Sequence, residues 1–274
     1  MKKFYDWENA VKNMKKPLIF DTHAHYDDNA FQEDQQELLE QFGDLGIGAV
    51  TDPGSTHESL GRIVALTQHY PWIYGALGIH PSECEGMTDE WLREIEEKMK
   101  LPQMVSVGEI GLDYHWEEPQ RSRQQYWFRQ QLRLARRLDR PVIIHSRDAA
   151  EDTLRILREE GAGEVGGVIH CYSYSPQLAQ SFLDLGFYIG VGGVVTFKNG
   201  KKLKETVRRI PLERIVLETD SPYMAPEPHR GERNCSLFLR YVVQTIAELK
   251  ETSAEEVVRQ TWQNACRLYR LEQE

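Results

Sequence analysis

The stretch Leu18-Ile19-Phe20-Asp21-Thr22-His23-Ala24-His25 opens with an apolar run and ends in two histidines two residues apart. A short apolar run of this kind favours a strand that is buried on both faces. Because side chains alternate along a strand, His23 and His25 are expected on one side, with Asp21 below them. Two imidazoles at the end of a buried strand suit a metal ion, but a metal site needs further converging ligands. The same pair is also consistent with two polar residues that open a loop.

Length and charge limit the kinds of protein that this chain can be. Its 274 residues suffice for one large α/β barrel or for two smaller domains. The net charge of −10 disfavours broad electrostatic binding to nucleic acid, which normally uses a basic face. A phosphate-bearing substrate would therefore need local positive charge from arginines or metal ions.

The cysteines and the N-terminal segment bear on the cellular compartment. No two cysteines form a C-x-x-C pair, and the four are scattered over Cys84, Cys171, Cys235 and Cys266. This spacing argues against a disulfide framework or a zinc ribbon and fits the reducing cytosol. Residues 1–16 lack the apolar core of a secretory signal, and no apolar run is long enough to cross a membrane. We therefore expect a cytoplasmic protein in which an N-terminal extension (1–16), with a short helix, precedes one domain (17–274).

Strand-like and helix-like stretches alternate along the chain without a linker. The predicted strands are 18–25, 48–54, 72–80, 104–109 running on to 114, 141–145, 167–172, 187–191 and 214–220. The predicted helices are 28–45, 55–69, 88–100, 119–138, 149–160, 176–185, 201–209, 236–249 and 254–268. Eight such units predict a single-domain α/β protein of the (β/α)8 TIM-barrel class. A doubly wound open sheet is the alternative, but it would carry a Gly-rich phosphate loop after the first strand.

Polar residues that suit a metal end six of the predicted strands. They are His23 with His25, His80, Glu109, His145, His170 and Asp220. In a barrel the carboxyl ends of all strands meet on one face, where active sites lie. Because buried charges need partners, this recurrence predicts a metal site. Alternation places Asp21 and Glu218 one layer deeper, where they either orient the ligands or make plain core hydrogen bonds.

Six short motifs follow one another along the chain. They are Asp21-Thr22-His23-Ala24-His25, Gly78-Ile79-His80-Pro81, Gly108-Glu109-Ile110-Gly111-Leu112-Asp113-Tyr114, Ile144-His145-Ser146-Arg147, His170-Cys171-Tyr172-Ser173 and Glu218-Thr219-Asp220-Ser221-Pro222-Tyr223. In this order the motifs resemble the TatD family, which comprises metal-dependent deoxyribonucleases and related hydrolases on an amidohydrolase-like barrel. The resemblance covers about residues 18 to 270 and is specific, because the motifs fall where the barrel needs them.

The resemblance implies one or two divalent metal ions, with zinc, manganese, iron or magnesium as candidates. The first ion would be held by His23, His25 and Asp220, and the second by His145 and His170, with Glu109 as the bridge. Two cations about 3.5–4 Å apart suit an in-line phosphoryl displacement with water as the nucleophile. Asp220 would take a proton from the attacking water and pass it to the leaving oxygen.

Substrate contacts are weaker expectations, and each has a structural alternative. Arg147 shares a face with His145 and suits a phosphate, or it forms an ion pair. Tyr114 suits stacking on a base, or it packs a loop. His80 is expected to bind a substrate phosphate or to hydrogen-bond at the rim. The loop 230–236 departs from the Asn-Glu-Pro that is common in the family, and Ser236 is expected to cap the next helix.

The first functional hypothesis is a metal-dependent deoxyribonuclease that cuts phosphodiester bonds of DNA from a strand end. The second is a hydrolase of another ester, amide or lactone on the same scaffold. Relatives of that kind carry a carboxylated lysine at the end of strand four, where Glu109 stands here, and this favours the nuclease. A metal-holding binding protein without catalysis is the third hypothesis. The metal, the physiological substrate, the cleavage polarity and the oligomeric state stay open.

Overall fold

Eight parallel strands form the centre of the protein in a computed structural model, which describes residues 19–271. They are β1 (Ile19–Asp21), β2 (Ile47–Pro53), β3 (Ile73–Ala76), β4 (Met104–Asp113), β5 (Val142–Arg147), β6 (Gly167–Ile169), β7 (Tyr188–Val191) and β8 (Ile215–Leu217). Neighbours in sequence are neighbours in the sheet. The barrel closes between β8 and β1, where Thr22 N donates to Leu217 O over 2.9 Å and Ala24 bridges to Ser221. The predicted (β/α)8 barrel is confirmed, and the predicted extension (1–16) lies outside the described residues.

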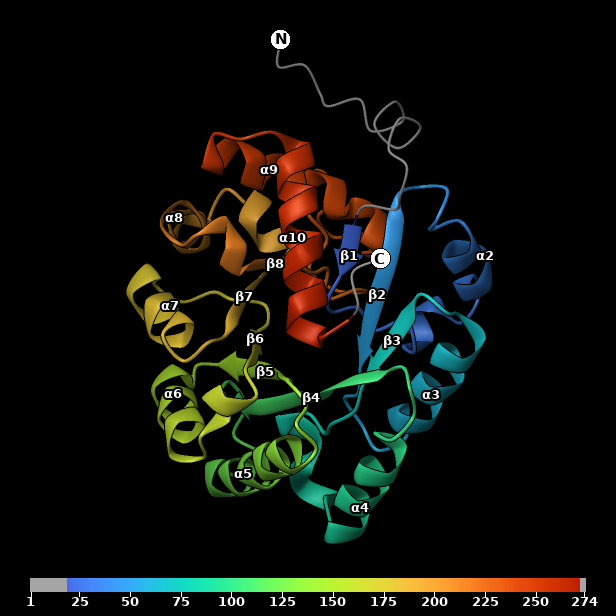
Figure 1. Ribbon diagram of the computed structural model, residues 1–274, viewed down its shortest axis with the longest axis vertical. Coiled ribbons are helices and arrows are strands. Elements are labelled where there is room, and N and C mark those ends of the chain that lie inside the picture. The colour runs from blue at the N-terminus through green and yellow to red at the C-terminus, as the bar shows by residue number, and fades with distance from the viewer. Residues whose placement is uncertain (1–18, 272–274) are drawn as a thin grey trace.

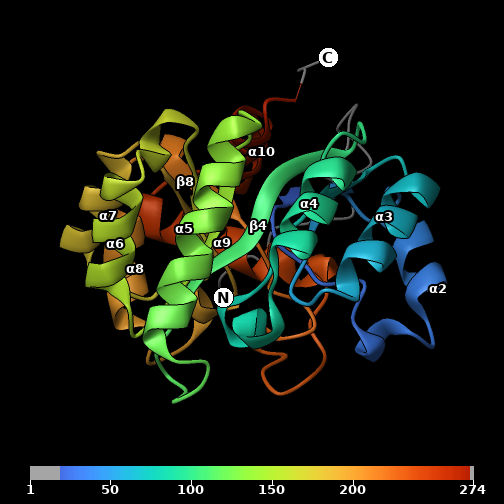
Figure 2. The same ribbon diagram turned by 90° about the horizontal axis from the view of Figure 1, so that it is seen from below.

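Helices cover the outside and one end of this barrel (Figure 1). They are α2 (Gln35–Glu40), α3 (Ser59–His69), α4 (Asp89–Lys98), α5 (Arg121–Arg137), α6 (Ala150–Glu159), α7 (Pro176–Leu183), α8 (Lys201–Arg209), α9 (Leu239–Lys250) and α10 (Ala254–Tyr269). The long strand β4 runs between α4 and α5 (Figure 2), while α10 lies across one end of the barrel (Figure 1). Between residues 19 and 271, no helix has both the length and the apolar character needed to cross a bilayer.

The interior of the barrel is closed at one end by α10. Alternate strand residues such as Phe20, Ile143 and Val216 form one inner cluster, and Leu268 and Tyr269 of α10 complete it. The intervening strand residues join a second cluster with the surrounding helices. This division follows from the two-residue period of a strand, which sends successive side chains to opposite faces. Because α10 closes this end of the barrel, a site can form only at the opposite end, where the strands terminate.

Several predicted element lengths are wrong. The helix expected over 28–45 is reduced to α2, because Asp28 accepts a hydrogen bond from Ala30 N and starts a separate 3-10 turn (Asn29–Phe31). Strands β6 and β8 stop before the predicted metal-site residues at their ends. The chain turns there into positive φ, at Cys171 (φ 45°) and Asp220 (φ 58°), which breaks the ladder. The shortened strands place the polar side chains at the mouth instead of in the sheet.

The loop 230–236 adopts a conformation that the sequence reading did not predict. Ser236 caps no helix, because its hydroxyl donates to Asp21 Oδ2 over 2.6 Å. A buried carboxylate needs such donors, because they offset the cost of removing its charge from water. Asn234 is buried, and its amide donates to the carbonyl oxygens of Thr219 and Tyr223. The loop is thereby tied to the end of β8, next to Asp220.

Candidate metal centre

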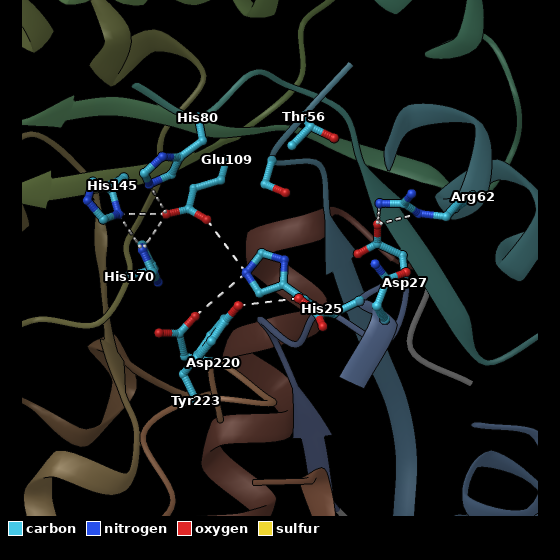
Figure 3. Close-up of a pocket in the computed structure, with 13 residues that line it drawn as sticks. His25, Asp27, Thr56, Arg62, His80, Glu109, His145, His170, Asp220 and Tyr223 are labelled. Atoms are coloured by element: carbon cyan, nitrogen blue, oxygen red, sulfur yellow. Dashed lines mark hydrogen bonds and ion pairs between the residues drawn. The ribbon is translucent and has the colours of Figure 1, made fainter. Parts of the chain in front are cut away.

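A pocket opens at the carboxyl ends of the strands, and all the histidines at its floor come from predicted positions (Figure 3). Its lining combines imidazoles, carboxylates and a few hydroxyl groups. The lining residues are His25, Asp27, Asp28, Asn29, Ser55, Thr56, Arg62, His80, Glu109, His145, His170, Asp220 and Tyr223. His23 lies beneath them and is fully buried. The barrel thus gathers residues from β1, β4, β5, β6 and β8 into one place.

One oxygen of Glu109 faces the histidines that follow β1. The Nε2 atoms of His23 and His25 lie 3.1 Å apart, and they lie 3.3 and 3.8 Å from Glu109 Oε2. Asp220 Oδ1 is 3.6 Å from both nitrogens. Two nitrogens and two oxygens therefore converge on one point from three different strand ends.

The other oxygen of Glu109 faces a second pair of histidines. His145 Nδ1 and His170 Nε2 each lie 2.7 Å from Glu109 Oε1 and 3.2 Å from one another. His80 Nε2 is 3.6 Å from the same oxygen, while its Nδ1 pairs with Ser82 Oγ over 2.7 Å. Glu109 is 3 % exposed, so its two oxygens are divided between the two groups instead of facing solvent. The carboxylate stands between them as a bridge would.

These distances fit the ligand spheres of metal ions. Ligands about 2.1 Å from a tetrahedral ion lie about 3.4 Å from one another. The separations of 3.1 to 3.8 Å in the first group match that spacing. Nitrogen and carboxylate oxygen are donors that zinc, manganese and iron accept. The first group therefore fits one ion, and the second group offers the same donor types around the other oxygen of Glu109, at the shorter separations of 2.7 and 3.2 Å.

The surroundings of Glu109 and Asp220 hold both carboxylates in the ionised form that a metal ion needs. Burial opposes the charge on Glu109, but His170, His23 and His80 outweigh it and hold the pKa of Glu109 well below its usual value. Burial likewise opposes the charge on Asp220, and the hydrogen bond from His25 and the charge of His170 lower its pKa below the usual value.

The pKa values of His23 and His25 shift in opposite directions because their neighbours differ. Burial lowers the pKa of His23 to about 4, so this ring is neutral at physiological pH. Burial also disfavours the charged form of His25, but Asp220 and Glu109 outweigh it and raise its pKa to about 10. A ligand must lose its proton before it coordinates, so metal binding at the first group competes with a proton on His25. The apparent metal affinity of this group therefore falls as the pH decreases.

Two acceptors that sequence reasoning missed orient the coordinating rings. Asp113 Oδ2 lies 3.1 Å from His145 Nε2 and accepts a hydrogen bond from it, which holds the ring with Nδ1 toward Glu109. The carbonyl of Pro53 lies 3.2 Å from His25 Nδ1 and does the same for that ring. Such partners select the tautomer and raise the basicity of a ligand. Asp113 belongs to the motif Gly108–Tyr114, four residues after Glu109. Only the register of the paired strands places it beside β5.

Replacing Asp113 by asparagine is expected to weaken metal binding at the second group about 10- to 100-fold. Asp113 accepts from His145 and from His115 N, whereas an asparagine has only one acceptor oxygen for these two donors. A zinc competition titration measures the change. Asp148→Asn is the matched control, because Asp148 faces His115 at the surface over 3.5 Å and should have no effect. Equal affinities of the wild type and Asp113→Asn would contradict the assignment.

The two deeper carboxylates orient the backbone more than the rings. Asp21 accepts from Thr219 N and Oγ1, from Ser236 Oγ and from His23 N, so it ties the end of β8 to the segment after β1. Burial raises the pKa of Asp21 to about 6. Glu218 Oε1 accepts from Cys171 N over 2.5 Å, and burial raises its pKa to about 8. Neither carboxylate forms a hydrogen bond with a ligand imidazole in the described residues.

Two of the three predicted substrate contacts lie outside the pocket lining. Tyr114 donates its hydroxyl proton to Asp152 over 2.8 Å and accepts from Gln125. Arg147 is exposed and lies 6.0 Å from the ring of Trp116. His80 does line the pocket. Substrate contact by these three residues stays a prediction. The pocket also contains Arg62 and Asp27, which the strand-end rule could not select because neither ends a strand.

Comparison with known proteins identifies the family. The family model for TatD related DNase matches residues 20–270. The uncharacterized metal-dependent hydrolase YabD of Bacillus subtilis is 41 % identical over 93 % of this chain and 100 % of its own length. The uncharacterized metal-dependent hydrolase YcfH of Escherichia coli is 36 % identical over 93 % of this chain and 97 % of its own.

Solved structures agree with the sequence relatives. The TatD homologue YjjV of Escherichia coli is 33 % identical and superposes with a TM-score of 0.87, over 93 % of this chain and 98 % of its own. The organophosphorus hydrolase of Deinococcus radiodurans, at 15 % identity and a TM-score of 0.65 over 92 % of both chains, shares the fold alone. The family match, the curated relatives and the paired clusters agree with one another, and the chain belongs to the TatD family of metal-dependent hydrolases.

Proposed function

We propose that this protein is a metal-dependent deoxyribonuclease that hydrolyses phosphodiester bonds of DNA from a strand end. The observation that carries the proposal is the division of Glu109, whose Oε2 faces His23 and His25 while its Oε1 faces His145 and His170. A carboxylate shared in this way suits two neighbouring divalent ions, and such pairs are typical of enzymes that cleave phosphate esters. The matching family, TatD related DNase, supports the same substrate class.

Divalent ions held by these residues would supply a lowered pKa for water and would neutralise the charge that develops on the phosphate oxygens. The side chains of the protein provide the rest. Glu109 and the four histidines would hold the ions, and the buried acceptors Asp113 and Pro53 O keep two of the rings from rotating.

Asp220 is the residue that moves the proton in this proposal. Its Oδ1 faces His23 and His25, and its side chain is 19 % exposed, so the carboxylate reaches the pocket. Held in the ionised form, Asp220 accepts a proton from the attacking water. It then donates that proton to the leaving sugar oxygen, which would otherwise depart as a basic alkoxide.

A hydrolase of another ester, an amide or a lactone is the alternative, since the barrel is shared with an organophosphorus hydrolase at low identity. A metal-holding protein without catalysis is the further alternative. We infer a cytoplasmic location from the four cysteines, which are all free in the described structure. DNA is the proposed partner.

Metal removal tests the proposal. We expect that dialysis against a chelator abolishes cleavage of end-labelled single-stranded DNA, and that adding back zinc, manganese or magnesium restores it. The labelled products report whether cleavage starts from an end and from which end. Products from esters or lactones but not from DNA would select the alternative hydrolase. A metal-loaded protein that cleaves no substrate of these classes would leave only the binding protein.

A further inference from the structure

The pocket extends beyond the metal centre toward the start of α3, and this extension contains one strong cation. Arg62 lies on the first turns of α3 and is the only lysine or arginine among the described residues that line the pocket. Figure 3 shows Arg62 and Asp27 on the side of His25 that faces away from His145 and His170. The lining of the pocket also includes Ser55 and Thr56.

Asp27 orients the guanidinium of Arg62. Arg62 Nε donates to Asp27 Oδ2 over 3.2 Å, and Nη2 lies 3.2 Å from the same oxygen. The Asp27 side chain is 3 % exposed, while that of Arg62 is 49 % exposed. Asp27 is itself held, because its backbone N–H donates to the buried Asp52 Oδ2 over 3.1 Å. The edge of the guanidinium with Nε and Nη2 is therefore held by Asp27, while Nη1 has no protein acceptor among the described residues.

A free guanidinium edge at this position suits a phosphate. Arginine binds phosphate through two parallel N–H donors, and fixing one edge in advance reduces the entropy lost when the other edge binds. The surrounding wall contains Asp27 and Asp28, in a chain with a net charge of −10. Among the described lining residues, Arg62 is therefore the one lysine or arginine that can attract an anionic strand, whereas Asp28 repels it.

Thr56 adds a second donor to the lining of the same pocket. Its Oγ1 accepts the backbone N–H of Ser59 over 3.1 Å, which fixes the hydroxyl at the start of α3. Among the described residues the hydroxyl proton has no acceptor, so it is available to a ligand oxygen. The N-terminal end of α3 also carries the positive end of the helix dipole, which favours an anion nearby.

We propose that Arg62, oriented by Asp27 and assisted by Thr56, binds the phosphate next to the one that is cleaved. This inference rests on the proposed function and specifies its substrate class: a strand with at least two consecutive phosphates, in preference to an isolated phosphate ester. Asp27 is then a positioning residue, and Arg62 determines specificity through the strand and takes no part in bond cleavage.

The test compares a short single-stranded DNA with bis(p-nitrophenyl) phosphate, which has one phosphate. Arg62→Gln should raise KM for the DNA about 10-fold or more, as expected for the loss of a charged hydrogen bond. The loss in kcat/KM should be at least 10-fold larger for the DNA than for the one-phosphate ester. Arg62→Lys keeps the charge without the fork and should lose less. Arg93→Gln is the control, because Arg93 is exposed on α4 and pairs with Glu90.

A neutral methylphosphonate in place of the flanking phosphate identifies the contact. With the wild type it should reduce kcat/KM about as much as Arg62→Gln does, and in Arg62→Gln it should have little further effect. Equal losses on both substrates, or additive losses of the two changes, would overturn the inference. If the wild type cleaves neither substrate, the proposed function fails. Binding of the labelled DNA, measured by fluorescence anisotropy, then decides: about 10-fold weaker binding by Arg62→Gln supports the subsite, and unchanged binding overturns it.

Discussion

Glu109→Ala is expected to lower kcat for DNA hydrolysis by roughly 1000-fold or more while the barrel stays folded. Removing the carboxylate takes one ligand oxygen from each of the two groups, because Oε2 serves His23 and His25 and Oε1 serves His145 and His170. Several kcal/mol of charge stabilisation in the transition state depend on the ions that these groups would hold, and each 1.36 kcal/mol is a tenfold change in rate. The measurement combines steady-state kinetics with metal analysis of the purified variant.

Glu94→Ala is the matched control for this experiment. Glu94 pairs with His57 over 2.8 Å, as Glu109 pairs with its histidines, but it lies on α4 outside the pocket lining. The control should keep full activity and a full metal content. Thermal unfolding of both variants separates a lost bridge from a lost fold. A Glu109→Ala protein that is folded and fully active would falsify the bridging role.

Asp220→Asn is expected to reduce kcat for DNA about 100- to 10,000-fold, the range that proton transfer by a positioned side chain contributes. Asparagine has nearly the same shape and keeps one oxygen toward His23 and His25, but it cannot accept the proton of water. Because p-nitrophenolate is a weakly basic leaving group, the loss should be smaller for bis(p-nitrophenyl) phosphate than for DNA.

Metal content separates the two roles of Asp220. The second group, at His145 and His170, does not include Asp220 and should retain its ion in the variant. Equal losses of kcat on both substrates would contradict the role of Asp220 as the acid. An unchanged kcat on both substrates would contradict its roles as acid and as base. A combined loss of activity and of all bound metal would show that Asp220 acts through ligation alone.

Prediction from the sequence was most successful for features that combine a local sequence pattern with a rule of barrel topology. Strands were recognised by short apolar runs, and the polar residues that followed them were expected to meet because all strands of the barrel point the same way. The structure brings the six predicted ligands together at that end. The prediction for Ser236 was wrong. Its local context favoured helix capping, but its hydroxyl binds the buried Asp21, which is more than 200 residues away in the sequence.

Residues that act across the barrel were missed for the same reason. Asp113 and Arg62 lie in ordinary contexts along the chain, one at the end of β4 and the other on a solvent-facing turn of α3. Their partners, His145 and Asp27, are 32 and 35 residues away. No local period or motif indicates such a pairing, because it depends on strand register and on how a helix packs against the sheet.

The amino-acid sequence by itself determined the order of strands and helices, the barrel class and the residues able to bind a metal ion, since each is recorded in spacing along a few consecutive positions. Only the tertiary structure decided that the two oxygens of Glu109 face different histidine pairs and that Asp27 binds the guanidinium of Arg62. Those arrangements depend on side-chain rotamers and on contacts between distant segments, which exist only once the barrel has closed.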